Sequence, residues 1–338
     1  MSESSANLLF ALSESAELAA EIARRASIEL APLEERPFEE GEFKLRPLVS
    51  VRDRTVFVLE TLAGTADAPV AQRLVRLLFL LFGLRDAGAA RTIALVPYLS
   101  YARKDRRTQL RDPVNTRYVA ELLEATGFAR LVALDVHNPA ALDNAFRIPV
   151  DHLSALPMFV DHFARRLPGT DLVVASPDVG GIKRVQLFRE LLAQRLGRDI
   201  DIAFVEKRRA GGVVSGGAVA GSVAGRTAIV LDDLCATGGT LIRAAAALRE
   251  AGATAVHVAV THAPLAKGLA ALVAAPGVSG IVITDSVGTA LHARTSSEGN
   301  KLTVLAVAPL FAEAVSRIVG RIPLAPLLER WPPSDRKP

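Results

Sequence analysis

Short apolar runs alternate along this chain with longer stretches in which apolar residues recur every three or four positions. The first pattern is typical of buried strands and the second of helices that cover a sheet, and their alternation indicates parallel strands joined by helical crossovers. Strands are expected at 55–60, 91–96, 131–135, 172–175, 201–205, 228–231, 255–261, 280–284 and 302–305. Helices are expected at 14–26, 71–86, 116–126, 156–166, 181–196, 239–251 and 310–319. The fold class is therefore predicted to be α/β, with mainly parallel sheets flanked by helices.

The chain is long enough for two domains, since its 338 residues exceed the ~150 that are typical of one. A short polar stretch containing a proline interrupts the pattern near 148–155. We predict an N-terminal domain at 1–150, a second domain at 151–330 and a frayed tail at 331–338, with the last helix free to pack on the first domain. The segment 34–41, rich in Pro, Gly and acids, is expected to project as a loop or hairpin.

Composition excludes several classes of protein. Half of the residues are apolar and 22% are charged, which indicates a folded chain. A net charge of +4 and a pI of 9.4 are weak signs of nucleic-acid binding. The single cysteine, Cys235, excludes internal disulfides and multi-cysteine zinc sites. The N-terminus carries acids where an export signal needs cations, and the apolar stretch 77–84 lies between Arg76 and Arg85, so we expect a cytoplasmic protein without a membrane span.

The segment AIVLDDLCATGGTL, from Ala228 to Leu241, carries the clearest chemical signal. A buried strand ends at Asp232 and Asp233, and a loop of small residues then opens a helix. Free backbone amides at a helix N-terminus bind anions, and glycine lets a phosphate approach the backbone. Carboxylates would repel that phosphate at contact, but they can hold the hydroxyls of a sugar attached to it. An ordinary tight turn capped by one aspartate is the alternative.

This run resembles the 5-phosphoribosyl diphosphate (PRPP) signature of the type I phosphoribosyltransferase family. The resemblance implies that Asp232 and Asp233 hold the 2- and 3-hydroxyls of a ribose. It also implies a 5-phosphate site in the loop formed by Ala236, Thr237, Gly238, Gly239 and Thr240.

A second group of charged residues lies in the run VPYLSYARKDRR at 96–107. Arg103, Lys104 and Arg106, with Asp105 among them, form a cationic loop directly after a predicted strand. Such a loop suits a polyphosphate, because arginine forks chelate its oxygens. The chain contains no Gly-x-x-x-x-Gly-Lys-Ser/Thr run, so a nucleotide would be held without a P-loop. A solvated basic turn is the alternative.

Two further segments carry residues of possible catalytic use. His137, in DVHN, and Asp178, in SPDVGG, each follow a predicted strand, where open α/β sheets place their ligands. They form a sparse set for Mg²⁺, which takes further oxygens from water and phosphates, and a lone histidine after a strand is more often structural. Lys207 and Arg209, in VEKRR, precede a glycine-rich segment and suggest a lid over phosphoryl charge, with a flexible basic hairpin as the alternative.

In this order the segments resemble the ribose-phosphate pyrophosphokinase (PRPP synthetase) family, from FEEGE at 38–42 to the last helix. The resemblance implies two phosphoribosyltransferase-like domains, ATP and ribose 5-phosphate as substrates, Mg²⁺, and self-association into dimers or larger homo-oligomers, with neither nucleic acid nor membrane as a partner. It implies metal contacts from His137 and Asp178 and catalytic roles for Lys207 and Arg209. The implied ATP contacts are Phe38, Glu40, Glu42, Arg103, Lys104, Asp105 and Arg106, the first three across a subunit contact.

The activity implied is transfer of the β,γ-diphosphoryl group of MgATP to the C1 hydroxyl of ribose 5-phosphate, which gives PRPP and AMP. A phosphoribosyltransferase that consumes PRPP with a base is one alternative, and the first half of the chain speaks against it. A non-catalytic regulatory paralogue is another, although such a subunit need not keep His137, Asp178, Lys207 and Arg209 together. A nucleic-acid-binding regulator has only the high pI in its favour.

Three positions depart from the commonest bacterial pattern of that family. Ala236 stands where many members have Asp, Lys104 replaces a frequent Gln, and the pair at 39–40 replaces Ser-Asp. The first change removes a negative charge beside the phosphate loop and resembles members with a small residue there. We therefore transfer neither a hexameric assembly nor ADP inhibition to this chain.

Overall fold

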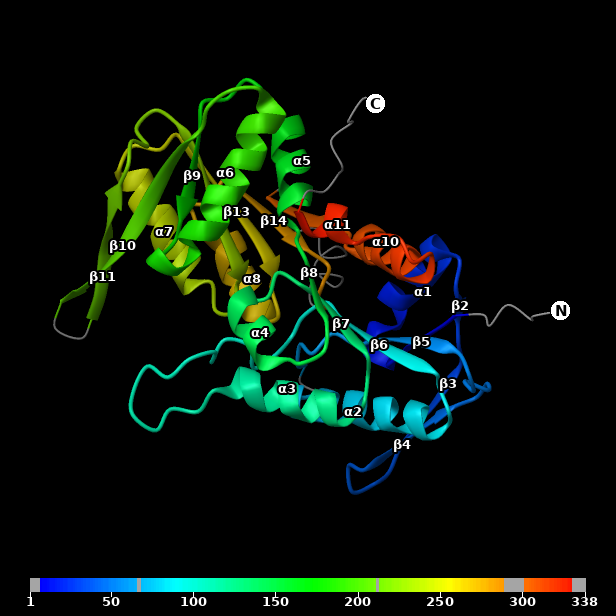
Figure 1. Cartoon of the computed structure of the whole chain (residues 1–338). Helices are drawn as coiled ribbons and strands as arrows, with labels where there is room; N and C mark the ends of the chain where they lie inside the picture. Colours follow the sequence, from blue (N-terminus) through cyan, green and yellow to red (C-terminus); the bar gives the residue numbers. More distant parts are fainter. Residues whose placement is uncertain (1–6, 66–67, 211–212, 289–300, 330–338) are drawn as a thin grey trace. The chain divides into compact units, whose positions relative to one another are not determined.

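The computed structural model describes residues 7–65, 68–210, 213–288 and 301–329 (Figure 1). The tail at 331–338 lies outside the described residues. The chain forms two compact units, of which unit 1 is drawn from Met1–Ser154 and Val307–Pro338 and unit 2 from Ala155–Ala306. Within the described stretches, no helix has the length and apolar character needed to cross a bilayer.

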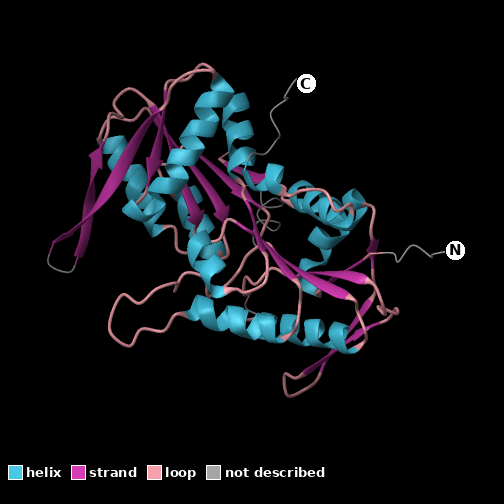
Figure 2. Cartoon of the chain, viewed as in Figure 1, coloured by secondary structure: helices cyan, strands magenta, loops and turns pink. Residues whose placement is uncertain are grey.

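Unit 1 is built on a parallel sheet, whose described strands follow the order β2-β1-β5-β6-β7-β8. The strands are β1 (Leu8–Ala11), β2 (Glu29–Leu30), β5 (Thr55–Leu59), β6 (Arg91–Val96), β7 (Arg130–Leu134) and β8 (Val150–Leu153). The helices are α1 (Ala16–Ala26), α2 (Val70–Asp86), α3 (Asn115–Ala125), α4 (Pro139–Ala145), α10 (Ala308–Val319) and α11 (Ala325–Glu329), with a short 3-10 turn η1 (Ser13–Ser15). The central strands are buried along nearly their whole length because helices cover both faces of the sheet (Figure 2).

A two-stranded hairpin of β3 (Leu33–Pro37) and β4 (Phe43–Pro47) extends from unit 1, so the hairpin alternative for 34–41 is confirmed. Its turn is closed by the amide of Phe38, which donates to the carbonyl of Glu42 over 2.8 Å. Arg76 of α2 pairs with Glu35 of the hairpin and, over 2.6 Å, with Glu14 of η1. The hairpin is therefore anchored at its base and exposed at its tip.

Unit 2 is built on a larger sheet, whose described strands follow the order β11-β10-β9-β12-β13-β14-β15. The strands are β9 (Leu172–Ser176), β10 (Asp201–Ala210), β11 (Val213–Ala220), β12 (Thr227–Leu234), β13 (Ala255–His262), β14 (Gly280–Thr284) and β15 (Leu302–Leu305). The helices are α5 (Leu156–Arg166), α6 (Ile182–Leu196), α7 (Gly239–Glu250) and α8 (Ala266–Ala274), with a 3-10 turn η2 (Val179–Gly181). Strand β11 runs antiparallel to β10. The other neighbouring strands of this sheet, in the order β10-β9-β12-β13-β14-β15, pair in parallel.

The strands and helices expected from the pattern are all present, with ends that differ by a few residues. Strand β10 is longer than expected because it continues to Ala210 and pairs with β11. Gly197 ends α6 with a φ of +67°, the left-handed conformation that favours glycine at a helix C-terminus. The pattern missed short elements such as β1, β8 and α4, since four to seven residues are too few to show a period.

Helix α10 returns the end of the chain to unit 1, where it packs against α1. Its Phe311 is fully buried, whereas Val319 at its last turn is 38% exposed. We predict that Phe311→Ala lowers the free energy of unfolding of unit 1 by about 3–5 kcal/mol, because it opens a cavity in the core. The control Val319→Ala should cost less than ~1 kcal/mol, since little apolar surface is lost. Urea unfolding followed by circular dichroism measures both, and equal effects would contradict the prediction.

Candidate functional site

Two carboxylates lie at the end of β12 in unit 2. Asp233 is buried and Asp232 is half-buried, and the amide of Asp233 donates to Oδ1 of Asp232 over 2.9 Å. Nη1 of Arg184 lies 3.0 Å from Oδ1 of Asp233 and 3.6 Å from Oδ1 of Asp232. Arg184 belongs to the first turn of α6, and sequence reasoning missed it because no local motif connects that turn to β12.

The surroundings of this pair disfavour negative charge. Burial, followed by the neighbouring Asp233 carboxylate, raises the pKa of Asp232 to about 8 although Arg184 lowers it. Burial also raises the pKa of the Cys235 thiol to about 11, and the charge of Asp232 adds to this shift. Cys235 therefore stays a protonated, buried filler, as expected from the absence of a second cysteine.

The loop 236–240 joins the carboxylates to α7. Gly238 has a φ of +77° and stands directly before the helix, so the amides of the first turn remain free of intrahelical partners. Thr237 is exposed, and Nη2 of Arg243 lies 3.4 Å from Oγ1 of Thr240. The predicted strand, acidic pair and glycine loop thus form one continuous unit that offers acceptors for hydroxyls and donors for an anion.

Helix α8 packs closely against the loop 236–240. A Cβ atom on Gly268 would lie 2.1 Å from the carbonyl oxygen of Ala236, and a Cβ on Gly238 would lie 2.8 Å from the carbonyl oxygen of Gly268. Two backbones therefore approach closely at this point, which only glycine allows. Sequence reasoning missed Gly268 because a single glycine inside an apolar helix is not a recognisable signal.

Two other predicted residues of unit 2 lie on β10. Lys207 falls where the pairing of β10 with β11 shifts register between Glu206 and Arg208, and Arg209 pairs with Val214. A bulge of this kind changes the direction of a side chain and often lies beside a functional site. The side chains of Lys207 and Arg209 themselves lie outside what the structure describes.

Asp178 follows β9 and caps η2, where its Oδ1 accepts the amide of Gly180 over 3.0 Å. Since β9 pairs in parallel with β12, Asp178 and the Asp232–Asp233 pair lie at the same edge of the sheet. The family resemblance implies metal contacts from Asp178 and from His137, which belongs to unit 1, and this stays a prediction. Within the described part of the chain, no three His, Cys, Asp or Glu side chains gather closely enough to hold a metal ion by themselves.

In unit 1 the predicted cationic loop lies between β6 and α3. Arg103 and Arg106 are exposed, while Nζ of Lys104 lies 2.5 Å from Oδ2 of Asp112. Asp112 also accepts the amides of Thr108 and Gln109, and these contacts, with Lys104 first, hold its pKa well below the ordinary range. Lys104 therefore pairs with Asp112 of its own loop and stabilises the conformation of that loop.

The same loop meets the segment that carries His137. Asn138 caps α4 by accepting the amide of Ala141 over 3.2 Å, and its Nδ2 donates to Oδ2 of Asp105 over 2.5 Å. His137, the preceding residue, is exposed. Two segments predicted for different roles thus come together at the carboxyl ends of the neighbouring strands β6 and β7.

The third predicted group of unit 1, at the turn of the β3–β4 hairpin, lies elsewhere. Phe38, Glu40 and Glu42 are all exposed there. Figure 1 shows this turn at the tip of the β3–β4 hairpin, while the long loop that leads into α3 is a separate part of the chain.

Comparison with known proteins shows what the chain is similar to. The family model for the N-terminal domain of ribose phosphate pyrophosphokinase matches residues 7–127, and the model for the phosphoribosyl synthetase-associated domain matches residues 215–328. Ribose-phosphate pyrophosphokinase 1 of Streptococcus pyogenes serotype M1 is 34% identical over 325 residues, which cover 95% of this chain and 97% of the relative. The chain belongs to the ribose-phosphate pyrophosphokinase family.

Other members of this family agree in sequence and structure. Ribose-phosphate pyrophosphokinase 1 of Streptococcus pneumoniae serotype 4 is also 34% identical, over 95% of this chain and 96% of its own length. The crystal structure of phosphoribosylpyrophosphate synthetase from Mycobacterium smegmatis matches with a TM-score of 0.83 at 31% identity, over 94% of this chain and 99% of the other. The expected family and the α/β fold with two mainly parallel sheets are confirmed, while the interpretation of Ala236 as marking a variant stays a prediction.

The close approach of α8 to the loop 236–240 can be tested by mutation. Gly268→Ala should lower the free energy of unfolding by about 1–3 kcal/mol, because the new methyl group meets a backbone carbonyl that cannot move aside. Gly83→Ala is the matched control, since Gly83 lies in α2 with nothing within 4 Å of an added Cβ and should gain about 0.5–1 kcal/mol. Urea unfolding decides, and a stabilised Gly268→Ala would refute the contact.

The raised pKa of Asp232 predicts a pH-dependent stability. In the folded protein Asp232 keeps a proton between its ordinary pKa of 3.8 and about 8, whereas the unfolded chain has lost it there. Stability that depends on this proton is present at low pH and is lost as the pH rises through that window. The wild type should therefore lose stability relative to Asp232→Asn between pH 4 and 8, measured by urea unfolding. Parallel profiles of the two proteins would count against the shift.

Proposed function

We propose that this chain is a catalytic ribose-phosphate diphosphokinase, which transfers the β,γ-diphosphoryl group of MgATP to the C1 hydroxyl of ribose 5-phosphate and releases PRPP and AMP. One observation carries the proposal: in a member of this family, a pair of carboxylates leads into a glycine loop, and the first amides of the helix that follows have no intrahelical partners. Unit 2 would bind the sugar phosphate, and unit 1 would bind the nucleotide.

In the sugar site, Asp232 and Asp233 accept the hydrogen bonds of the ribose 2- and 3-hydroxyls. The loop amides from Thr237 to Thr240 donate to the 5-phosphate, and the two threonine hydroxyls add donors. Arg184 offsets part of the charge of the carboxylates and keeps them oriented toward the sugar. Ala236 brings no charge of its own to this loop.

In the nucleotide site, Arg103 and Arg106 supply charge for the triphosphate. They are exposed and take part in no ion pair among the described residues, so their guanidinium groups are available for phosphate oxygens. Lys104 and Asp105 shape the loop through Asp112 and Asn138. Phe38, Glu40 and Glu42 would reach this site from a second copy of the chain, as the family resemblance implies, and all three are exposed at the tip of the hairpin. Self-association is therefore part of the proposal.

A magnesium ion fits the donor chemistry of His137 and Asp178. An imidazole and a carboxylate supply two ligands, and Mg²⁺ commonly completes its shell with water and substrate phosphate oxygens. Oδ1 of Asp178 is already oriented by the amide of Gly180, which fixes the carboxylate in place. When bound, the ion would supply positive charge to the polyphosphate.

In the reaction, the C1 oxygen forms a bond to the β-phosphorus, and the bond from that phosphorus to the oxygen bridging it to the α-phosphate breaks, so AMP leaves. Lys207 and Arg209 neutralise the charge on the transferred group. The other residues position the two substrates, and this accounts for most of the rate gain expected in phosphoryl transfer.

Two other functions give different results in one assay. A phosphoribosyltransferase would need PRPP and a nucleobase as substrates and would release no AMP. A regulatory paralogue would bind ATP and ribose 5-phosphate without turnover. Incubation with MgATP and ribose 5-phosphate alone, followed by detection of AMP and an acid-labile sugar diphosphate, distinguishes the proposed activity from both alternatives, which yield neither product.

We predict that Lys207→Ala abolishes AMP release while ribose 5-phosphate still binds, because Lys207 acts on the transferred group. The double variant Asp232→Asn/Asp233→Asn should instead lose sugar binding, measured by calorimetry. Arg165→Ala, which removes an exposed cation at the end of α5, is the control and should turn over like the wild type. Unchanged turnover in Lys207→Ala would overturn its catalytic role.

A further inference from the structure

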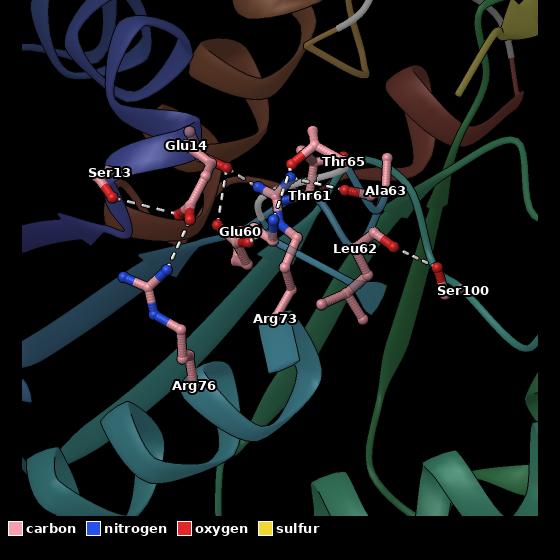
Figure 3. Close-up of polar contacts among 12 residues, drawn as sticks. Ser13, Glu14, Glu60, Thr61, Leu62, Ala63, Thr65, Arg73, Arg76 and Ser100 are labelled. Atoms are coloured by element: carbon pink, nitrogen blue, oxygen red, sulfur yellow. Dashed lines mark hydrogen bonds and ion pairs between the residues drawn. The ribbon is translucent and has the colours of Figure 1, made fainter. Parts of the chain in front are cut away.

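An ion pair is buried where β5 of unit 1 ends. Glu60 follows β5 directly, and Nε of Arg73, in the first turn of α2, lies 2.5 Å from its Oε1 (Figure 3). Oγ of Ser15 donates to Oε2 of Glu60 over 2.8 Å and accepts the amide of Thr61 over 3.1 Å. The side chains of Glu60 and Arg73 are 0% and 3% exposed. Both carboxylate oxygens are therefore held from two separate elements.

This arrangement is a costly way to fill a core. Burial raises the pKa of Glu60 to about 7 in spite of the attraction of Arg73. Nη2 of Arg73 is buried and has no hydrogen-bond partner among the described residues, a loss of roughly 1–3 kcal/mol. Apolar side chains of similar volume commonly stabilise a core as well as a buried ion pair does. Stability alone therefore does not explain the pair, and its geometry points to a role in positioning.

Arg73 connects the carboxylate to the segment 60–65. Its Nη1 donates to the carbonyl of Ala63 over 2.6 Å while its Nε holds Glu60, so one planar guanidinium fixes two points of the same segment. Gly64 follows, where an added Cβ would lie 2.9 Å from the amide nitrogen of Val70. The segment is thus pressed against the start of α2 and has little freedom to shift.

The segment in turn holds the beginning of the cationic loop. The amide of Leu62 donates to the carbonyl of Tyr98 over 2.9 Å, and Oγ of Ser100 donates to the carbonyl of Leu62 (Figure 3). Ser100 lies three residues before Arg103. A continuous series of hydrogen bonds therefore leads from Glu60 and Arg73 to the loop that displays the phosphate-binding arginines.

We propose that the Glu60–Arg73 pair is a positioning element for the nucleotide site, which fixes the 97–107 loop through the backbone of Leu62 and Ala63. The inference rests on the proposed function, because it assigns that loop to ATP. Neither Glu60 nor Arg73 would touch the substrate. The sugar site lies in unit 2 and has its own supports, so it does not depend on the pair.

The decisive variant is Glu60→Leu/Arg73→Met, which removes both charges and keeps the core filled. We expect it to fold, with kcat/KM for ATP lower by a factor on the order of 10², because small displacements of a positioned group are costly. The KM for ribose 5-phosphate should change less than about twofold, since the sugar contacts are untouched. Amides 98–107 should also exchange hydrogen faster than in the wild type.

The matched control is Arg130→Met/Asp151→Leu, which removes another ion pair of the same sheet, with an Nη1–Oδ2 distance of 2.5 Å, at the opposite ends of the strands. It should leave the KM for ATP and the exchange of 98–107 unchanged. If the decisive variant fails to fold, Arg73→Lys keeps the charge but loses the fork, and it should show the same selective loss of kcat/KM for ATP, with a raised KM for ATP.

The outcomes separate the inference from the proposed function. A folded double variant with unaltered KM for ATP and unaltered exchange at 98–107 would overturn the positioning role, as would an equal weakening toward both substrates. Absence of AMP from the wild-type protein would instead contradict the proposed function, and the exchange at 98–107 would still decide whether the pair holds the loop.

Discussion

The parallel pairing of β12 with β9 on one side and β13 on the other is the constraint on which the proposed sugar site depends. It places the ends of β9 and β12 at one edge of the sheet, so Asp178 and the Asp232–Asp233 pair lie at that edge. The pairing with β13 continues to Leu234, which keeps the carboxylates at a rigid strand end and leaves only the loop 236–240 irregular. A loop on such a support would need little reorganisation to bind an anion, as proposed for this one.

The two units use similar parallel sheets in different ways. In unit 2 the strand β12 is followed by the small residues of the loop 236–240, which let an anion approach the backbone. In unit 1 the end of β5 is closed by the Glu60–Arg73 pair, and the cations lie farther along the chain on the loop after β6. A shared architecture therefore carries the glycine loop 236–240 in one unit and the exposed cations Arg103 and Arg106 in the other.

The parts of the candidate site that could be predicted from the sequence are those whose residues follow one another in the chain. The strand, acidic pair and glycine loop around Asp232 follow one another directly, so pattern and chemistry located them together. Arg184, Gly268 and the Glu60–Arg73 pair could not be found this way, because each acts on a segment brought near by the tertiary fold. The pairing of Lys104 with Asp112 was missed for a further reason: an exposed lysine in a basic run has many possible partners, and its choice depends on how the loop folds back.

The return of α10 to unit 1 has a consequence for the order of folding during synthesis. Unit 2 is inserted between the two sequence segments of unit 1. Helix α1 therefore cannot pack against α10 until nearly the whole chain has been synthesised. Unit 2, by contrast, is continuous and has all of its strands available earlier. The inserted unit can therefore become native first, while the surface of α1 that α10 covers stays exposed for most of translation and depends on rapid completion of the chain to avoid aggregation.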